Sequence, residues 1–340
     1  MKAIVKNRPG RGVSVMDYPD PAKGKDPIIK ILAAAICGTD VHVYEGSDAY
    51  SGMKDPVVIG HEACGVVEDP GESGLSKGQK VVLDSVWYCG TCFWCKMGKE
   101  NLCANRKTVG LHIDGAFAEY VSIPQRCVIP VSQQADPTVF SCAEPFGIAM
   151  HAMERADCNL GDSAVIIGPG PIGLMSVILC RRAGLSPVAV IGTRQDKKRL
   201  ALAEQLGAEM IFYAEDDTYQ EAILRATGGL GPSHIFEWSG SQAGFSSAAK
   251  LIMPGGELLV GAIYGKEISM NLTSLVRREI TVKTVRSRVY HTWQRAIALL
   301  EKNEVDLTPI VSHIFPIAKA EEAFELASNK EGIKIVFSFT

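Results

Sequence analysis

Four cysteines lie close together in the first half of the chain. Cys89, Cys92, Cys95 and Cys103 follow the spacing C-x2-C-x2-C-x7-C. Four thiolates so spaced can close a tetrahedral shell around Zn²⁺, and a closed shell leaves no position open for a substrate. Two disulfides are the alternative use of these residues, and the spacing matches neither ferredoxin pattern of iron–sulfur ligands. The spacing therefore predicts a structural zinc lobe over about residues 88–105.

A second set of possible metal ligands is spread along the sequence. Cys37 lies in Cys-Gly-Thr-Asp, His61 and Glu62 lie in Gly-His-Glu, and Glu144 lies in Ala-Glu-Pro. Cysteine, histidine and carboxylate are the ligands of catalytic zinc, which keeps one position for water or substrate. The fourth residue after His61 is glycine, so the HExxH motif of zinc proteases is absent. Taken singly, Cys37 could be a small core residue and His61 a core histidine.

A glycine motif separates an apolar run from a predicted helix. Gly168, Gly170 and Gly173 form G-x-G-x-x-G, with Pro171 and Ile172 inside it. In a dinucleotide site the first glycine makes the turn, the second lets the backbone approach a pyrophosphate, and the third lets helix and strand pack. A glycine turn can also simply join a strand to a helix. Its place between a strand and a helix favours a dinucleotide site, and its presence strengthens the metal hypothesis for Cys37 and His61.

The end of the next predicted strand bears on the choice between NAD and NADP. Residues 188–191 lead into Gly-Thr193-Arg194, where the acid that binds the ribose of NAD is missing. A hydroxyl and a guanidinium match a 2′-phosphate, although Asp196 is close by. This pattern favours NADP over NAD. Gly261, at the end of a later predicted strand, completes the candidate cofactor-binding residues.

Composition places the chain among soluble globular proteins. Its 340 residues suggest about two domains, with 46% apolar and 21% charged residues. A net charge of −3 argues against a nucleic-acid partner. The first residues lack the apolar core of a secretory signal, and the longest apolar run, residues 164–180, is interrupted by glycine and proline. Ten cysteines without a signal fit a reducing cytoplasm, and no membrane partner is expected.

The predicted secondary structure changes in type near residue 164. Before it, β-rich segments without a long helical period predict a compact β domain, and two helical stretches near 136–142 and 146–155 follow. After it, alternating strands and helices predict a parallel sheet covered on both faces, and the last predicted strand is 334–337. The predicted early strands are residues 2–5, 28–35, 63–68, 79–86 and 116–122.

Together these features resemble the zinc-dependent medium-chain dehydrogenase/reductases, which include alcohol, sorbitol and threonine dehydrogenases. The resemblance spans nearly the whole chain and also includes Gly-Ala-Phe-Ala-Glu-Tyr at residues 115–120. It implies an α/β fold with a GroES-like domain at 1–147 and 288–340 and a Rossmann domain at 148–287. It also implies two zinc ions per chain and a homotetramer or dimer.

The resemblance assigns roles to the second ligand set. In the sorbitol and threonine branches the catalytic ligands correspond to Cys37, His61 and Glu62, with Glu144 as a mobile or water-mediated fourth ligand. Alcohol dehydrogenases have a cysteine-type ligand where this chain has Glu144. The resemblance therefore points to the sorbitol and threonine side, and it leaves open which glutamate touches the metal.

The resemblance also implies the reaction. Thr39 would hold the hydroxyl proton, His42 would pass it to solvent, and Arg288 aligns with an arginine on the substrate side. The expected reaction is reversible hydride transfer between a secondary alcohol (a polyol, sugar, cyclitol or amino alcohol) and a nicotinamide. The alternatives are a zinc-independent enone or quinone reductase on this fold, and a non-enzymatic protein that binds NADP and zinc.

Overall fold

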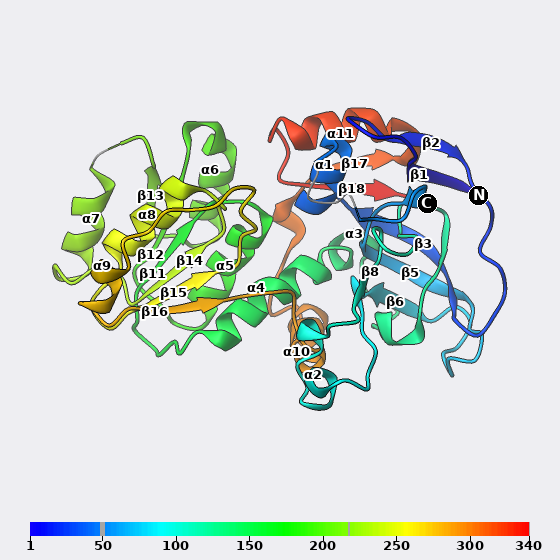
Figure 1. Cartoon of the computed structure of the whole chain (residues 1–340), viewed down its shortest axis with the longest axis horizontal. Helices are drawn as coiled ribbons and strands as arrows, with labels where there is room; N and C mark the ends of the chain where they lie inside the picture. Colours follow the sequence, from blue (N-terminus) through cyan, green and yellow to red (C-terminus); the bar gives the residue numbers. More distant parts are fainter. Residues whose placement is uncertain (48–51, 217, 340) are drawn as a thin grey trace. The chain divides into compact units, whose positions relative to one another are not determined.

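The chain forms two compact units. The structure, a computed structural model, describes residues 1–47, 52–216 and 218–339 (Figure 1). One unit contains Met1–Pro145 together with Arg288–Thr340, and the other contains Phe146–Ser287. Within the described ranges, none of the helices is both long enough and apolar enough to cross a membrane.

The first unit is built on a curved β-sheet. The order is β10-β6-β5-β3-β18-β17, and β9 also pairs with β3. Because β18 lies antiparallel to β3, the last strand of the chain is part of the sheet that the first hundred residues begin. A small second sheet has the order β2-β1-β4. The strands are β1 (Lys2–Lys6), β2 (Ser14–Asp17), β3 (Ile28–Ala35), β4 (Val57–Val58), β5 (Glu62–Asp69), β6 (Lys80–Leu83), β9 (Tyr120–Ser122), β10 (Val128–Pro130), β17 (Val311–Pro316) and β18 (Lys334–Ser338).

Helices and a short lobe complete this unit. Its core contains a cluster of phenylalanines, in which Phe117 contacts Phe324 and Phe337 edge to face. The lobe leaves the sheet through the β7–β8 pair and carries a short helix and a 3-10 turn. The elements are α1 (Gly38–Glu45), β7 (Val86–Trp87), α2 (Phe93–Lys96), η2 (Glu100–Leu102), β8 (Lys107–Thr108), η3 (Gln125–Cys127), α3 (Pro137–Phe140), α10 (Tyr290–Glu301), η5 (Thr308–Ile310), η6 (Ile317–Lys319) and α11 (Ala320–Ser328). Helix α4 (Ala143–Arg155) begins here and continues into the second unit.

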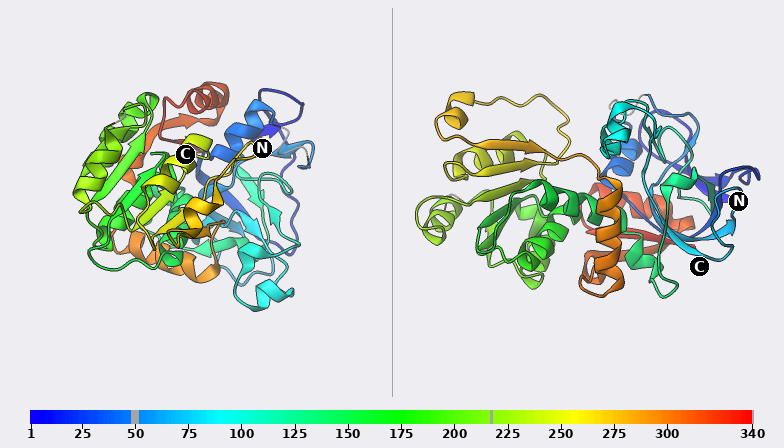
Figure 2. Two further views of the ribbon diagram at one scale, coloured as in Figure 1. Left: turned by 60° about the vertical axis from the view of Figure 1, so that its left-hand side comes forward. Right: turned by 90° about the horizontal axis from the view of Figure 1, so that it is seen from below.

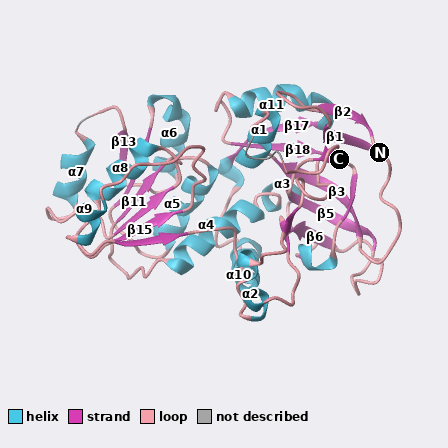
Figure 3. Ribbon diagram, in the orientation of Figure 1, coloured by secondary structure: helices cyan, strands magenta, loops and turns pink. Residues whose placement is uncertain are grey.

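The second unit is a six-stranded parallel sheet. Its order is β13-β12-β11-β14-β15-β16, with every pair parallel. This is the doubly wound order of a dinucleotide-binding fold, and Figures 2 and 3 show helices on both faces of the sheet. The predicted fold class is confirmed. The elements are β11 (Ala164–Ile167), α5 (Pro171–Arg182), β12 (Val188–Gly192), η4 (Arg194–Asp196), α6 (Lys197–Gln205), β13 (Met210–Tyr213), α7 (Tyr219–Ala226), β14 (His234–Glu237), α8 (Gln242–Leu251), β15 (Glu257–Val260), α9 (Leu272–Val276) and β16 (Thr281–Thr284).

Some predicted elements differ from the observed ones. The single strand predicted over 79–86 is two strands, because the carboxylate of Asp84 accepts a hydrogen bond from the amide of Val86 and turns the chain between them. The strand predicted over 116–122 is confined to β9, since the amides of Ala116 and Phe117 instead bond to the loop before β5. Helix α1 lies in the part of the chain where only β structure was predicted.

Candidate active site and zinc lobe

The four lobe cysteines come together as predicted from their spacing. Their sulfurs lie within 4.8 Å of one another. The Sγ–Sγ distances are 3.5 Å between Cys92 and Cys95, 3.6 Å between Cys89 and Cys103, and 4.0 Å between Cys89 and Cys95. Sulfurs placed at 2.3 Å from a tetrahedral zinc would lie about 3.8 Å apart, so the donor set fits this ion.

Thiol chemistry in the lobe also suits a metal. All ten cysteines of the chain are free thiols, so the disulfide alternative is not realised. Hydrogen bonds from the backbone amides of Thr91 and Cys92 lower the pKa of Cys89 to about 5. A thiolate, rather than a thiol, is the form that binds a metal ion.

The second ligand set assembles where two neighbouring strands meet. Cys37 follows the end of β3 and Glu62 begins β5, and these antiparallel strands place Ala35 opposite Glu62. Donor atoms of Cys37, His61 and Glu62 therefore lie within 4.8 Å of one another. His61 and Glu62 are buried, at 5% and 0% exposure.

One carboxylate oxygen of this cluster, Oε1 of Glu62, is buried without a hydrogen-bond partner among the described residues. A buried polar atom left without a partner is destabilising by about 1–3 kcal/mol, so such atoms are rare in folded proteins. A sulfur, an imidazole nitrogen and a carboxylate oxygen converging on one point form a donor set that fits zinc. The residues of this cluster are therefore suited to bind a zinc ion.

Asp40 holds the cluster in place, a role that was not predicted from the sequence. Its carboxylate accepts a hydrogen bond from the amide of Cys37 at 2.9 Å and one from Gly60 at 3.3 Å, and it lies 3.5 Å from Nδ1 of His61. A carboxylate beside a ligating histidine fixes the orientation of its ring. The signal was the Cys-x-x-Asp spacing, because the aspartate three residues after the N-cap closes a capping box at the start of α1.

Lys334 is a second residue that sequence reasoning missed. Its ammonium group lies 2.6 Å from Oε2 of Glu62 and donates to the carbonyl of Ile36 at 3.0 Å, with only 2% of the residue exposed. Burial raises the pKa of Glu62, and the charge of Lys334 opposes that rise. The charge of one Glu62 oxygen is thus neutralised by a lysine, while the other oxygen has no hydrogen-bond partner in the part of the chain that the structure describes.

Glu144 and Arg288 form a buried network next to the cluster. Arg288, whose side chain is fully buried, donates to Glu144 and to Asp84, each at 2.8 Å. The hydroxyl of Ser85 donates to the same oxygen of Glu144 at 2.6 Å. Burial alone would raise the pKa of Glu144, but the nearby charge of Arg288 lowers it below its usual value. Oε2 of Glu144 is buried without a hydrogen-bond partner among the described residues, as a fourth ligand would require.

The predicted proton relay lies on one face of α1. Thr39 and His42 are three residues apart in this helix, so their side chains are neighbours. Thr39 is half-buried, whereas the side chain of His42 is 58% exposed and lies 3.7 Å from Glu45. The pair therefore runs from the buried to the exposed side of the helix.

The glycine turn has the shape of a phosphate cradle. Gly168 has a φ of +96°, and a Cβ there would lie 2.8 Å from the amide of Ser239. A Cβ on Gly173 would lie 2.2 Å from the carbonyl of Gly168, so the helix packs tightly on the turn. At Gly170, the N-cap of α5, a Cβ would meet no described atom within 4 Å. Pro171 and Ile172 form the first turn of α5, whose free amides attract a phosphate.

Thr193 and Arg194 follow β12 as predicted, but carboxylates surround them. Asp196 accepts from the hydroxyl of Thr193 at 2.7 Å and closes a capping box. Arg194 forms an ion pair with Asp216, and its backbone amide donates to Glu215 at 3.1 Å. The acids that the sequence lacks at residues 192–194 are thus supplied from η4 and from the loop after β13.

Position 261 must be glycine, because an aromatic ring leaves no room for a side chain there. A Cβ at this position would lie 2.0 Å from the ring of Trp238, which follows β14. Glu237, at the end of β14, accepts from the amide of Ser239 at 2.8 Å and from the hydroxyl of Tyr264 at 2.5 Å. These contacts shape the edge of the sheet where dinucleotides bind in doubly wound folds.

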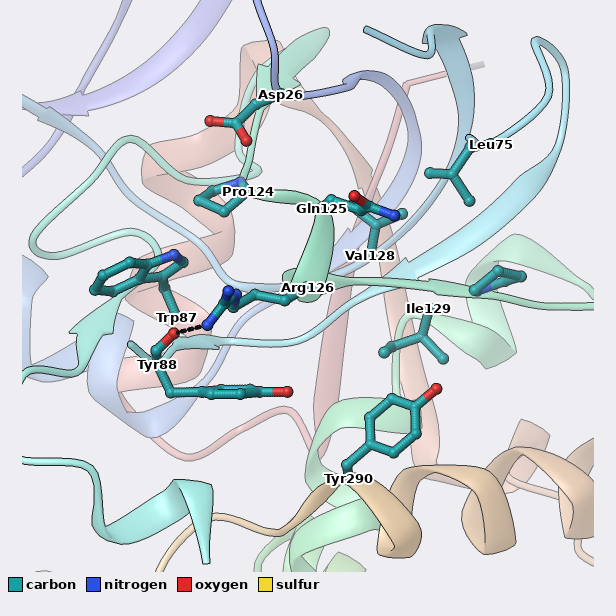
Figure 4. A pocket seen from close by; sticks show the side chains of 11 residues that line it. Asp26, Leu75, Trp87, Tyr88, Pro124, Gln125, Arg126, Val128, Ile129 and Tyr290 are labelled. Atoms are coloured by element: carbon teal, nitrogen blue, oxygen red, sulfur yellow. Dashed lines mark hydrogen bonds between the residues drawn. The ribbon is translucent and has the colours of Figure 1, made fainter. Parts of the chain in front are cut away.

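A cavity of about 570 Å³ in the first unit does not contain the candidate ligands (Figure 4). Arg126 dominates it, with its guanidinium over Tyr88 at 5.2 Å and hydrogen-bonded to the carbonyl of the same residue. None of Cys37, His61 and Glu62 lines it. Its lining is Asp26, Leu75, Trp87, Tyr88, Pro124, Gln125, Arg126, Val128, Ile129, Pro130 and Tyr290.

Comparisons with known proteins agree with this geometry. The profile of the alcohol dehydrogenase GroES-like domain matches residues 23–133, and that of the zinc-binding dehydrogenases matches residues 171–302. An L-threonine 3-dehydrogenase of Bacillus velezensis is 36% identical over 342 residues, which cover 99% of this chain and 98% of the relative. A sorbitol dehydrogenase of Halalkalibacterium halodurans is 30% identical, with 99% of both chains covered.

Solved structures give the same result. A protein of Escherichia coli described as a short chain alcohol dehydrogenase, complexed with NADH, has a TM-score of 0.91 at 25% identity, covering 100% of this chain and 99% of the other. A protein of Sinorhizobium meliloti described as a zinc-binding dehydrogenase and bound to NADP has a TM-score of 0.90 at 26% identity, covering 99% and 98%.

The fold and the site define a class. A Rossmann unit with a glycine turn, together with a unit that carries a cysteine–histidine–glutamate donor set, is the equipment of a nicotinamide-dependent dehydrogenase with a metal. The chain belongs to the zinc-dependent medium-chain dehydrogenase/reductases, as its motifs indicated. It is an NAD(P)-dependent enzyme that acts on hydroxyl compounds, with zinc and a nicotinamide as cofactors.

Proposed function

We propose that this enzyme reversibly oxidises a polar secondary alcohol (a polyol, sugar, cyclitol or amino alcohol) to the ketone. Curated relatives named for threonine and sorbitol, compounds of this class, support the proposal. The observation that carries it is the cluster of Cys37, His61 and Glu62, in which Oε1 of Glu62 is buried and has no hydrogen-bond partner among the described residues. Cys37, His61 and Glu62 would hold the catalytic zinc, with Glu144 as a fourth ligand.

Residues around the reacting hydroxyl have separate roles in proton transfer and in positioning the metal ligands. When bound, zinc supplies a Lewis acid that polarises the substrate oxygen. Thr39 accepts the hydroxyl proton as it passes its own proton on toward His42, and His42, exposed on the same face of α1, releases a proton to solvent. Asp40 fixes the ring of His61, and Lys334 balances the charge of Glu62. Arg288 acts as a positioning residue, because its guanidinium is fully buried and forms ion pairs with the carboxylates of Glu144 and Asp84.

The second unit binds the nicotinamide cofactor. The free amides at the start of α5 and the open space at Gly170 receive the pyrophosphate. Gly168, Gly173 and Gly261 allow the close backbone approaches that shape the site. We propose NADP as the favoured cofactor over NAD, on the strength of the Arg194 guanidinium, 63% exposed at the end of β12.

Three further assignments complete the proposal. The enzyme carries two zinc ions per chain, the second in the lobe formed by the four cysteines. It assembles as a homotetramer or dimer. The exposed edge of β16, where Val282 is 41% exposed, supports association, because an unpaired strand edge invites pairing with another chain. A cytoplasmic location is favoured by the free thiols of the lobe.

The test is turnover on a panel of hydroxyl compounds. Zinc-loaded protein is given polyols, sugars, cyclitols and amino alcohols, each with NAD and with NADP, while the absorbance of the reduced nicotinamide is followed. A hit on one of these classes is expected. Thr39→Val should lower kcat by about 100-fold without changing zinc content or cofactor affinity. Activity on enones that persists after the catalytic zinc is removed, or tight cofactor binding with no turnover on any hydroxyl compound, would contradict the proposal.

A further inference from the structure

The guanidinium of Arg194 already has an anionic partner. It forms an ion pair with Asp216, and it lies over the ring of Tyr213 at 5.1 Å. Strand register explains the meeting: β12 and β13 are parallel neighbours with Gly192 opposite Tyr213, so the residues that follow each strand emerge side by side. Asp216 therefore reaches the predicted 2′-phosphate position from a different strand.

The nearby carboxylates have different tasks. Asp196 binds the amide and hydroxyl of Thr193, at 3.0 and 2.7 Å, and so caps η4. Glu215 binds the backbone amide of Arg194 at 3.1 Å. Of the three, Asp216 is the acid paired with the Arg194 guanidinium.

In an exposed ion pair of this kind, the guanidinium can readily exchange one anionic partner for another. The side chains of Arg194 and Asp216 are 63% and 41% exposed, and pairs at such exposure are weak because water and salt screen them. A 2′-phosphate would bind the planar guanidinium through charge-assisted hydrogen bonds. To do so it must share the guanidinium with Asp216 or displace it, and it must also approach a second negative charge. The 2′-hydroxyl of NAD carries no charge and meets neither obstacle.

We propose that Asp216 is a specificity-determining residue, which reduces but does not reverse the preference for NADP by competing with the 2′-phosphate for Arg194. The inference rests on the proposed function, since it requires a dinucleotide in this unit. Tyr213 keeps the guanidinium beside β12 when Asp216 is replaced. The choice between NAD and NADP is then set by two strands: β12 supplies the cation and the loop after β13 supplies its competitor.

The test is the affinity of the full-length protein for NADPH and NADH, measured by titration calorimetry. In Asp216→Asn, we expect NADPH to bind about fivefold more tightly and NADH to change by less than about twofold. Adenosine 2′,5′-bisphosphate and AMP, used as probes without a nicotinamide, should show the same difference. In an Arg194→Ala background the effect of Asp216→Asn should shrink to less than about twofold, because the competition for the guanidinium is gone and only the screened charge of Asp216 remains.

The matched control is Glu221→Gln. Glu221 forms a similar exposed ion pair with Arg225 at 2.7 Å on α7 of the same unit, so its removal changes the net charge equally. It should leave the ratio of the two affinities unchanged. If both cofactors bind and Asp216→Asn leaves that ratio as it is in the wild type, the inference is wrong and the proposed function stands. If neither nucleotide binds the wild type, both are wrong.

Discussion

Replacing Arg288 with methionine tests the buried network that holds Glu144. Methionine keeps an unbranched side chain over Trp293, on whose ring the guanidinium lies at 4.3 Å, but it carries no charge. The substitution leaves the carboxylates of Asp84 and Glu144 without their cation. Their side chains are 12% and 4% exposed, so water cannot take over its role.

The expected loss follows from this burial. Removing one partner of a buried ion pair is destabilising by about 3–5 kcal/mol, because the other charge remains in a medium of low polarity. For a unit of this size each kcal/mol shifts Tm by about 2–4 °C, so Tm should fall by roughly 6–20 °C. Asp84→Asn in the same chain should recover about 1 kcal/mol, since asparagine removes one stranded charge and its oxygen can still accept from the Trp293 indole, now 2.9 Å from Asp84, at the loss of the bond from the Val86 amide.

Thermal and urea unfolding of the zinc-loaded protein provide the measurement. Arg225→Met is the control, because the ion pair of Arg225 with Glu221 is exposed at both ends and its loss should change stability by less than about 1 kcal/mol. If Arg288→Met is no more destabilised than this control, or if Asp84→Asn makes it worse, the charge-compensation argument is wrong.

Three further predictions concern the lobe, the cofactor turn and a surface network. Cys92→Ser should lower the zinc content from two ions to one per chain and expose the lobe to proteolysis, and an unchanged zinc count would contradict it. Gly170→Ala should keep Tm, because its φ of −68° suits alanine, yet weaken cofactor binding at least about tenfold, as calorimetry would show. Burial alone would raise the pKa of Asp162, but hydrogen bonds from the Asn159 amide and from His234 lower it. Asp162→Asn should therefore lower Tm at pH 7, and the difference from wild type should shrink as pH falls below about 4; a constant difference would contradict this.

Much of the site could be predicted from local sequence motifs, because the residues of each motif are close together along the chain. The lobe cysteines span residues 89–103, and the glycine turn spans 168–173, so spacing alone indicates their geometry. The strand β3 was predicted with its observed bounds, since its apolar run is interrupted only by Lys30, which is exposed.

Contacts between distant segments could not be predicted from the sequence. Lys334 meets Glu62 across 272 residues, through the pairing of the last strand with β3, and Arg288 meets Asp84 across 204 residues. In the sequence, Lys334 and Arg288 both look like ordinary surface charges, because their partners become neighbours only when the chain folds. Asp216 likewise reaches Arg194 only because β13 lies beside β12. Helix α1 was missed because it is short and its buried face includes the polar Asp40.

The central claim is that Cys37, His61 and Glu62 hold the metal on which turnover depends. The most direct measurement compares Cys37→Ala with the wild type in zinc content, NADH affinity and turnover on the best substrate of the panel. The account predicts one zinc ion in place of two, an unchanged NADH affinity and no measurable turnover. Retained turnover by Cys37→Ala with a single zinc ion would contradict it.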